Sequence, residues 1–146
     1  MSQIRIWIHL IWSTKNREKL ISPTIKPVLL KHIRENAKSK DIYLDFINCI
    51  EDHIHLLISL PPDQTIGKIV QLLKGESSYW MNQQKLRVGK FEWQDDYMAV
   101  SVSQSMIDKV REYIKNQEEH HRKKTFLEEY EELMKLYSFS IVNKSD

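Results

Sequence analysis

The sequence is poor in cysteine, glycine and proline, with 1 Cys, 3 Gly and 4 Pro among its 146 residues. Because Cys49 has no second cysteine to pair with, disulfides within the chain, cysteine-ligated zinc and a cysteine-dependent redox centre are excluded. The low glycine and proline content argues against a disordered or fibrous chain, and the length is that of one ordinary domain. Any metal site must therefore use histidine, carboxylate or amide ligands.

Long hydrophobic runs are also missing. No apolar stretch approaches the roughly 18 residues that are needed to span a bilayer. The first residues, Met1–Arg5, lack the apolar segment and the small-residue cleavage site of a signal peptide. We expect a cytoplasmic protein that does not associate with a membrane.

Neither sign of charge is in large excess, since 22 Lys and Arg face 20 Asp and Glu and give a net charge of +2. The charges are unevenly spread, with nine basic and two acidic residues in 1–40 but four acidic and no Lys or Arg residues in 41–62. Such segregation permits a basic face for phosphates in a protein of low net charge. Taken alone, it indicates no more than solvated helix faces.

The spacing of apolar residues predicts the secondary structure. Alternation over 4–11 predicts a strand, and the apolar stretch 42–60, with its polar break at 51–52, predicts two strands in a hairpin. Helical spacing predicts helices over 28–37, over 66–83 behind a Thr65 cap, and from Ile107 past Ile114 behind a Ser103 or Ser105 cap. A fourth strand is expected at 100–102, and an amphipathic helix at 126–137.

This order of elements indicates an α+β fold of the ferredoxin-like βαββαβ type. The chain divides into two strand-helix-strand units, which right-handed crossovers turn into an antiparallel sheet with helices on one face. The last segment would be an appended C-terminal helix. We expect one domain over residues 1–124 and a helical tail over 125–146.

Two histidines, His53 and His55, are two residues apart in the predicted hairpin. Residues at this spacing in a strand project to the same face, so two imidazoles would form half of a site for a divalent cation. A pair of polar histidines on a half-buried strand is an equally simple interpretation, because a metal needs more ligands. The neighbouring Asp52 is a candidate additional ligand, but its position next to His53 should point it to the other face.

A second group of polar residues lies on the third predicted helix. Tyr113 and Gln117 are four residues apart, and Lys109 precedes them by one turn, so a hydroxyl, an amide and an ammonium share one stripe. Taken alone, an amphipathic tyrosine at the margin of the core is the commoner interpretation.

Together, the His53-Ile54-His55 strand and the later Tyr113 and Gln117 resemble the single-tyrosine HUH transposases of the IS200/IS605 type, including relatives associated with repetitive extragenic palindromes. The resemblance extends over about residues 4–124. Its segments are Trp7–Lys15, Glu51–Ser59, Ile69–Ser78, Trp93–Val102 and Tyr113–Gln117.

The resemblance implies cleavage and rejoining of single-stranded DNA. Tyr113 would attack a backbone phosphate, keep the 5′ phosphate as a phosphotyrosine and release a 3′ hydroxyl. His53, His55 and Gln117 would hold Mg²⁺ or Mn²⁺, because a phenol with a pKa near 10 is a poor nucleophile without a polarised phosphate. The resemblance also implies a substrate with hairpin structure and a homodimer in which Tyr113 and Gln117 serve the histidines of the other chain.

The same resemblance implies DNA contacts in the second helix, in the first loop and beside the tyrosine. The expected contact residues are Lys15, Arg17, Lys74, Ser77, Ser78 and Lys109. Two other functions remain open at this point. One is a zinc hydrolase that adds His120 or His121 to the histidine pair, and the other is a nucleic-acid-binding module without catalysis.

Overall fold

The computed structural model describes residues 2–119 and 126–137. Four strands form one antiparallel sheet in the order β2-β3-β1-β4. The strands are β1 (Trp7–Ser13), β2 (Tyr43–Cys49), β3 (His53–Ser59) and β4 (Met98–Val102). The helices are α1 (Ile25–Ser39), α2 (Ile66–Gln84), α3 (Ile107–Lys115) and α5 (Phe126–Leu136), with short 3-10 turns at Lys15–Arg17 and Gln104–Met106.

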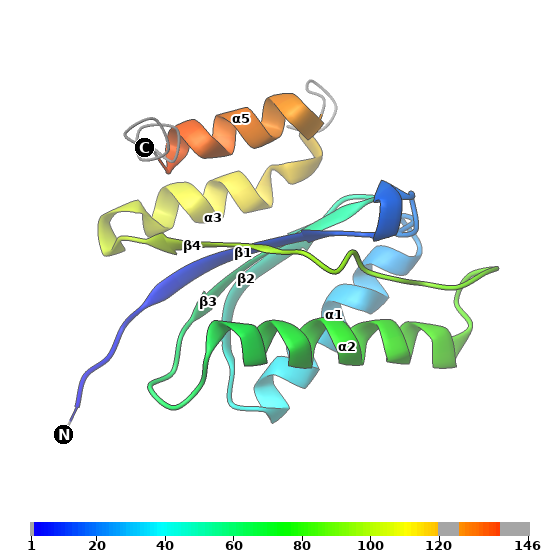
Figure 1. Ribbon diagram of the computed structural model, residues 1–146, viewed down its shortest axis with the longest axis horizontal. Helices are drawn as coiled ribbons and strands as arrows, with labels where there is room; N and C mark the ends of the chain where they lie inside the picture. The colour runs from blue at the N-terminus through cyan, green and yellow to red at the C-terminus, as the bar shows by residue number, and fades with distance from the viewer. Residues whose placement is uncertain (1, 120–125, 138–146) are drawn as a thin grey trace.

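The helices lie on both faces of the sheet (Figure 1). Helix α1 joins β1 to β2 and α2 joins β3 to β4, and both cover one face, so the predicted ferredoxin-like α+β fold is confirmed. The prediction that the helices lie on one face is correct only for α1 and α2. Helices α3 and α5 cover the opposite face, because the apolar side of α3 packs against side chains that the sheet directs away from α1 and α2.

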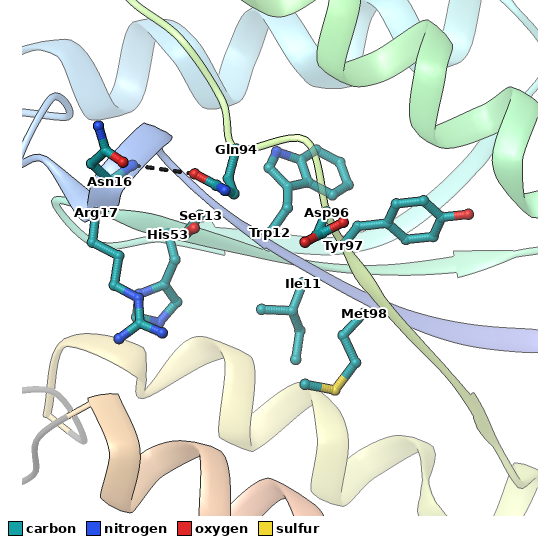
Figure 2. Close-up of a pocket in the computed structure, with 10 residues that line it drawn as sticks. All are labelled: Ile11, Trp12, Ser13, Asn16, Arg17, His53, Gln94, Asp96, Tyr97 and Met98. Atoms are coloured by element: carbon teal, nitrogen blue, oxygen red, sulfur yellow. Dashed lines mark hydrogen bonds between the residues drawn. The ribbon is translucent and has the colours of Figure 1, made fainter.

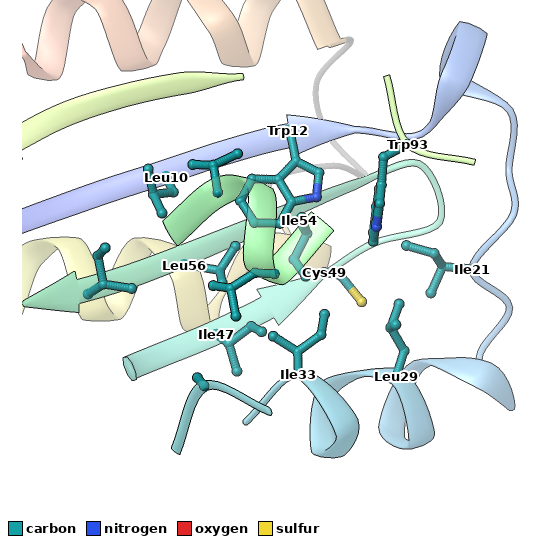
Figure 3. Close-up of a cluster of buried hydrophobic side chains, with 14 of the residues drawn as sticks. Leu10, Trp12, Ile21, Leu29, Ile33, Ile47, Cys49, Ile54, Leu56 and Trp93 are labelled. Atoms are coloured by element: carbon teal, nitrogen blue, oxygen red, sulfur yellow. The ribbon is translucent and has the colours of Figure 1, made fainter. Parts of the chain in front are cut away.

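Alternation along the strands separates two sets of buried side chains. Even-numbered residues of β1 and β3, such as Leu10, Ile54 and Leu56, pack with α1 and α2 in the main core (Figure 3). Odd-numbered residues such as Trp7 and Leu57 pack instead with Ile107, Val110 and Ile114 of α3. A residue two positions from Leu57 or Trp7 therefore faces the layer of α3 and α5.

The helix starts agree with the prediction in one case and differ in another. Thr65 caps α2, and its side chain accepts a hydrogen bond of 3.1 Å from the Lys68 amide, as expected. The expected cap of α3 by Ser103 or Ser105 is wrong. A 3-10 turn follows Ser103, and the N-cap position of α3 is Met106, which makes no side-chain cap hydrogen bond.

Helix α3 is held on the sheet by polar contacts with β2. Arg111 donates two hydrogen bonds to the Asp45 carboxylate, from Nε at 2.7 Å and from a terminal nitrogen at 2.9 Å. Asn48 Nδ2 donates to the Ile114 carbonyl at 2.8 Å. These contacts fix the position of α3 relative to the strands of its own chain.

Within the described ranges, no helix has the length and apolar character to cross a bilayer.

Candidate active site

His53 and His55 lie side by side on β3, on the face that α3 and α5 cover. Both side chains are buried, and their ring centroids are 5.2 Å apart. Ile54 between them points into the core beneath α1 and α2. The alternation of the strand thus brings the two imidazoles to one place.

Asp52 orients the first histidine. Its Oδ1 accepts a hydrogen bond of 2.8 Å from His53 Nδ1, which leaves the Nε2 lone pair facing away from the turn. Burial disfavours charge on His53, but the contacts with Asp52 and with Glu129 outweigh it and raise its pKa. The expectation that Asp52 points to the other face is wrong, because Asp52 lies in the turn before β3 and does not follow the alternation of the strand.

His9 of β1, which no sequence motif indicated as a site residue, contacts the second histidine. The pairing of Ile11 with His55 places His9 diagonally beside His55 on the same face. His9 is fully buried, and its Nε2 lies 2.9 Å from His55 Nδ1. Burial and the neighbouring His55 hold the pKa of His9 well below its ordinary value, so His9 is neutral.

The tautomer of the neutral His9 is coupled to the nitrogen of His55 that carries the proton. If His55 Nδ1 donates to His9 Nε2, then His9 Nδ1 donates to the Tyr137 hydroxyl, and His55 Nε2 presents its lone pair. His53 has the same arrangement through Asp52. Histidine ligands of metals commonly donate the second ring N–H to such a partner, so the contact with Asp52 orients His53 as a metal ligand, and this tautomer of His9 would do the same for His55. The signal in the sequence was the odd-numbered position of His9 in β1.

Tyr113 and Gln117 lie over the two histidines of their own chain, but the expectation that one helix carries both is wrong, because α3 ends at Lys115. The Tyr113 ring centroid is 5.7 Å from that of His55, and Gln117 Nε2 is 3.0 Å from His53 Nε2. Gln117 is fully buried, and its Oε1 has no hydrogen-bond partner in the described part of the chain. A half-turn of the amide would exchange its two ends and bring this oxygen toward His53.

Glu129 of α5 is the second site residue that no sequence motif indicated. Its side chain is buried, and its carboxylate oxygens lie 3.4 Å from the Nε2 atoms of both His53 and His55. Gln117 Nε2 donates to the same carboxylate, and the Tyr113 hydroxyl donates to it at 2.9 Å. Nothing in the pattern of the acidic tail distinguished Glu129 from its glutamate neighbours, apart from its place on the apolar side of an amphipathic helix.

The charges in this cluster shift two pKa values in opposite directions. Burial alone would raise the pKa of Glu129, but the contacts with His53 and His55 outweigh burial and hold it well below its usual range. Burial and then the Glu129 carboxylate raise the pKa of Tyr113 above its ordinary value. In this arrangement the carboxylate is ionised and the phenol is protonated.

The cluster has the donors that a divalent cation needs. Ligand atoms of His53, His55 and Glu129 all lie within 4.8 Å of one another, and the Gln117 amide is in contact with the same group. Nitrogen and oxygen donors of this kind fit a first-row divalent cation such as Mn²⁺ better than Mg²⁺, which prefers oxygen alone. His120 and His121 lie outside the described residues.

A cavity of about 680 Å³ opens beside His53, between the end of β1 and the segment before β4 (Figure 2). Its lining includes the polar side chains of Asn16, Gln94 and Asp96, and Arg17 adds a guanidinium to it. The size is within the range of small-molecule sites. The cavity is therefore lined both by His53 and by Arg17, which is one of the residues expected to contact DNA.

The other expected DNA contacts differ in accessibility. Ser77 is fully buried, and its hydroxyl accepts a hydrogen bond of 2.9 Å from Trp93 Nε1, so the expected contact of Ser77 with DNA is wrong. Helical spacing on α2 turns Ser77 toward the sheet, while Ser78 lies beside a second cavity. Lys74 lines that cavity and donates to backbone carbonyls before β4, among them that of Asp95 at 2.9 Å.

The two remaining lysines are on the surface. Lys15 forms an ion pair of 3.1 Å with Glu92. Lys109 is exposed on α3, whereas Tyr113 and Gln117 are buried, so the expected stripe of three groups is divided between surface and site.

Comparisons with known proteins agree with this geometry. The sequence model of the family described as "Transposase IS200 like" matches residues 2–117. The ISDra2 transposase TnpA of Deinococcus radiodurans is 30% identical over 115 residues, which are 75% of this chain and 81% of the relative. The transposase of insertion sequence element IS200 from Salmonella typhimurium is 26% identical over 115 residues, which are 75% of this chain and 74% of the relative.

Solved structures show the same fold. The crystal structure of a putative transposase from Deinococcus radiodurans R1 has a TM-score of 0.66 and 26% identity. The match covers 80% of this chain and 93% of the solved chain. The structure of a REP-associated tyrosine transposase bound to a REP hairpin has a TM-score of 0.61 and 14% identity. The match covers 80% of this chain and 72% of the solved chain. The matched range 2–117 includes the histidines of β3, Tyr113 and Gln117, but not Glu129. The chain belongs to the family of IS200-like transposases.

Proposed function

We propose that this transposase cleaves and rejoins single-stranded DNA through a 5′-phosphotyrosine on Tyr113. The observation that carries the proposal is the meeting of four side chains at one buried point. The Tyr113 hydroxyl, the Gln117 amide and the Nε2 atoms of His53 and His55 all contact the Glu129 carboxylate. The proposed nucleophile and the proposed metal ligands thus surround the negatively charged oxygens of one carboxylate. A DNA phosphate also presents negatively charged oxygens, so it could make the same contacts.

The proposed reaction exchanges one phosphodiester for another. The Tyr113 oxygen attacks phosphorus, the bond from phosphorus to the 3′ oxygen breaks, and the phenol proton ends on that 3′ oxygen. In rejoining, a 3′ hydroxyl attacks the phosphotyrosine and Tyr113 recovers its proton. Both steps conserve the number of phosphodiester bonds, so no external energy source is needed.

His53, His55 and Gln117 would hold Mg²⁺ or Mn²⁺. The bound cation would polarise the phosphate and offset the charge that develops on it. Asp52 and His9 support this role, because they orient the two imidazoles with Nε2 toward Gln117 and Glu129. The donor set of two imidazoles and an amide is neutral, which suits a cation that also binds an anionic substrate.

The substrate is proposed to be a single strand with hairpin structure. Support comes from the related REP-associated transposase that was solved with a REP hairpin, and from the cavity beside His53. Arg17 in the lining of that cavity can pair with a backbone phosphate, for which a guanidinium is well shaped.

The site is proposed to work within one chain. Tyr113 and Gln117 contact the histidines of their own chain, and Arg111 and Asn48 tie α3 to the sheet of the same chain. This arrangement differs from the shared site of a homodimer that the resemblance implies. The proposed boundary between the transposase domain and its tail, at 124/125, falls outside the described residues.

The test uses end-labelled single strands from the DNA that flanks the gene of this protein. With Mn²⁺ or Mg²⁺ we expect a covalent protein–DNA adduct that mass spectrometry places on Tyr113, and we expect excess chelator to abolish it. Tyr113→Phe should abolish the adduct, whereas Tyr79→Phe, a matched change of an exposed tyrosine on α2, should leave it intact. An adduct on another residue, or cleavage that persists in chelator, would contradict the proposal.

A further inference from the structure

We propose that Glu129 of α5 is a carboxylate ligand of the divalent cation in the DNA-free protein, and that it leaves the cation when a substrate phosphate binds. The inference deepens the proposed function and rests on it for the identity of the substrate. It concerns a residue beyond the range 2–117 that the family shares.

The separations between donor atoms fit a common cation. Two ligand atoms at about 2.1–2.2 Å from one ion are about 3.0–3.6 Å apart when the angle between them is about 90–110°. Glu129 oxygens lie 3.4 Å from His53 Nε2 and 3.4 Å from His55 Nε2. Both separations are longer than a good hydrogen bond and fall inside the range for two ligands of one metal.

The charge of the cluster also favours a cation. A buried carboxylate loses its hydration, and this cost is offset only by a charged partner or by good hydrogen bonds. In the described ranges the ion-pair partners of Glu129 are two imidazoles, each oriented by a partner on its Nδ1. A divalent cation between Glu129 and the imidazoles would add positive charge to the hydrogen bonds that Tyr113 and Gln117 donate to this carboxylate. The carboxylate in turn would add the hard oxygen ligand that Mn²⁺ and Mg²⁺ favour.

Packing of α5 holds Glu129 in this place. Leu133, one turn after Glu129, is buried against Ile11 and Tyr113. Tyr137, two turns after Glu129, contacts His9 through its hydroxyl. The carboxylate is therefore delivered by an apolar helix face that is complementary to the site, and not by a loosely attached tail.

The same carboxylate occupies the position that the reaction requires for phosphate. Its Oε1 accepts the Tyr113 hydrogen bond at 2.9 Å while its two oxygens face the histidines. During attack a phosphate needs the same contacts, with phosphorus beside the Tyr113 oxygen and a phosphate oxygen on the cation. Glu129 and the phosphate cannot share this place, so binding of one must displace the other.

The first experiment measures the affinity of the full chain for Mn²⁺ without DNA. Calorimetry and the electron paramagnetic resonance signal of the free ion are the two readouts. Loss of a direct ligand should weaken binding by at least about tenfold in Glu129→Gln. The matched control is Glu131→Gln, which removes the same charge from an exposed position of α5 and should bind Mn²⁺ as the parent protein does. Equal weakening in both variants, or no weakening in Glu129→Gln, would overturn the inference.

The second measurement tests displacement. At Mn²⁺ concentrations that saturate each protein, Glu129→Gln should form the Tyr113 adduct faster than the parent, because an amide competes less well with phosphate for a cation. A slower reaction would show that Glu129 stays in place and would overturn the exchange. Glu129→Asp, which keeps the charge but shortens the side chain, should bind Mn²⁺ with intermediate affinity, and thermal melts of all variants identify any that fail to fold.

The two proposals can fail separately. If Mn²⁺ binding depends on Glu129 but neither protein forms an adduct with any single strand, the ligand is established and the proposed function fails. If the parent forms a metal-dependent adduct and Glu129→Gln binds Mn²⁺ with unchanged affinity, the proposed function survives and the role of Glu129 is refuted.

Discussion

The Tyr113 hydroxyl donates a hydrogen bond of 2.9 Å to the Glu129 carboxylate, across 16 positions of sequence. The proposed nucleophile is thus engaged by an anion of its own chain. Because an adjacent negative charge disfavours the phenolate, this contact raises the pKa of Tyr113 together with burial, which is the larger cause. In the proposed reaction a substrate phosphate would replace this carboxylate beside the Tyr113 oxygen, and the bound cation would bring a positive charge.

The partner of His55 provides a test of ligand orientation. His9→Phe keeps a ring in the buried position but removes the nitrogen beside His55 Nδ1. We expect Mn²⁺ affinity to fall by about 10- to 100-fold, as is typical when the group that orients a metal-binding histidine is lost. Calorimetry gives the affinity, and His32→Phe is the control, because His32 pairs with Glu76 on the other side of the sheet. Unchanged affinity in His9→Phe would remove His9 from the site.

Ser77 and Ser78 are neighbours on α2, but we expect their substitution by alanine to affect the free energy of unfolding differently. Ser77→Ala removes the acceptor of the buried Trp93 N–H and should lower the free energy of unfolding by about 1–3 kcal/mol. Its effect on DNA affinity should be small, since the side chain is buried. Urea denaturation and a DNA-binding titration measure both quantities. Ser78→Ala should leave stability nearly unchanged, and a loss of DNA affinity confined to Ser77→Ala would contradict this assignment.

The contact between Arg111 and Asp45 provides a test of how α3 is held. The pair is bidentate but partly exposed, so we expect a coupling free energy of about 1 kcal/mol or less in a double-mutant cycle with Arg111→Met and Asp45→Asn. The exposed pair Lys31 and Glu35, four residues apart on α1, is the control and should couple more weakly. Coupling no larger than that of the control pair would mean that apolar packing alone positions α3.

Mixing two inactive chains distinguishes a site within one chain from a shared site. Tyr113→Phe and His53→Ala each remove one group that the proposed reaction requires. If the site lies within one chain, every copy in the mixture carries a lesion and no adduct forms. If two chains share their sites, each heterodimer contains one intact site and one doubly defective site.

The readout of the mixing experiment is the adduct formed by co-expressed chains, relative to the parent protein. Recovery of up to about half of the parental activity per heterodimer would refute the arrangement within one chain and support the homodimer that the resemblance implies. A tag on each chain shows whether heterodimers are present, so an absent adduct can be interpreted.

Local periodicity was sufficient to predict much of this protein. The alternation in β3 placed His53 and His55 on one face, because this depends only on the geometry of one strand. The spacing of four residues also predicted that Gln117 lies near Tyr113, but α3 ends at Lys115, so the two residues are not on one helix. The order of the elements was sufficient for the ferredoxin-like fold, since few topologies satisfy short connections and right-handed crossovers.

Tertiary packing decided what these side chains meet. His9 reaches His55 across 46 positions through the register of β1 with β3, and Glu129 reaches both histidines of β3 because the apolar face of α5 packs over Tyr113. Ser77 was expected at the surface, but the Trp93 side chain covers it. Spacing within one element reports which residues share a face, whereas the partner of that face is set by how separate elements pack, and no periodicity of a single segment encodes that choice.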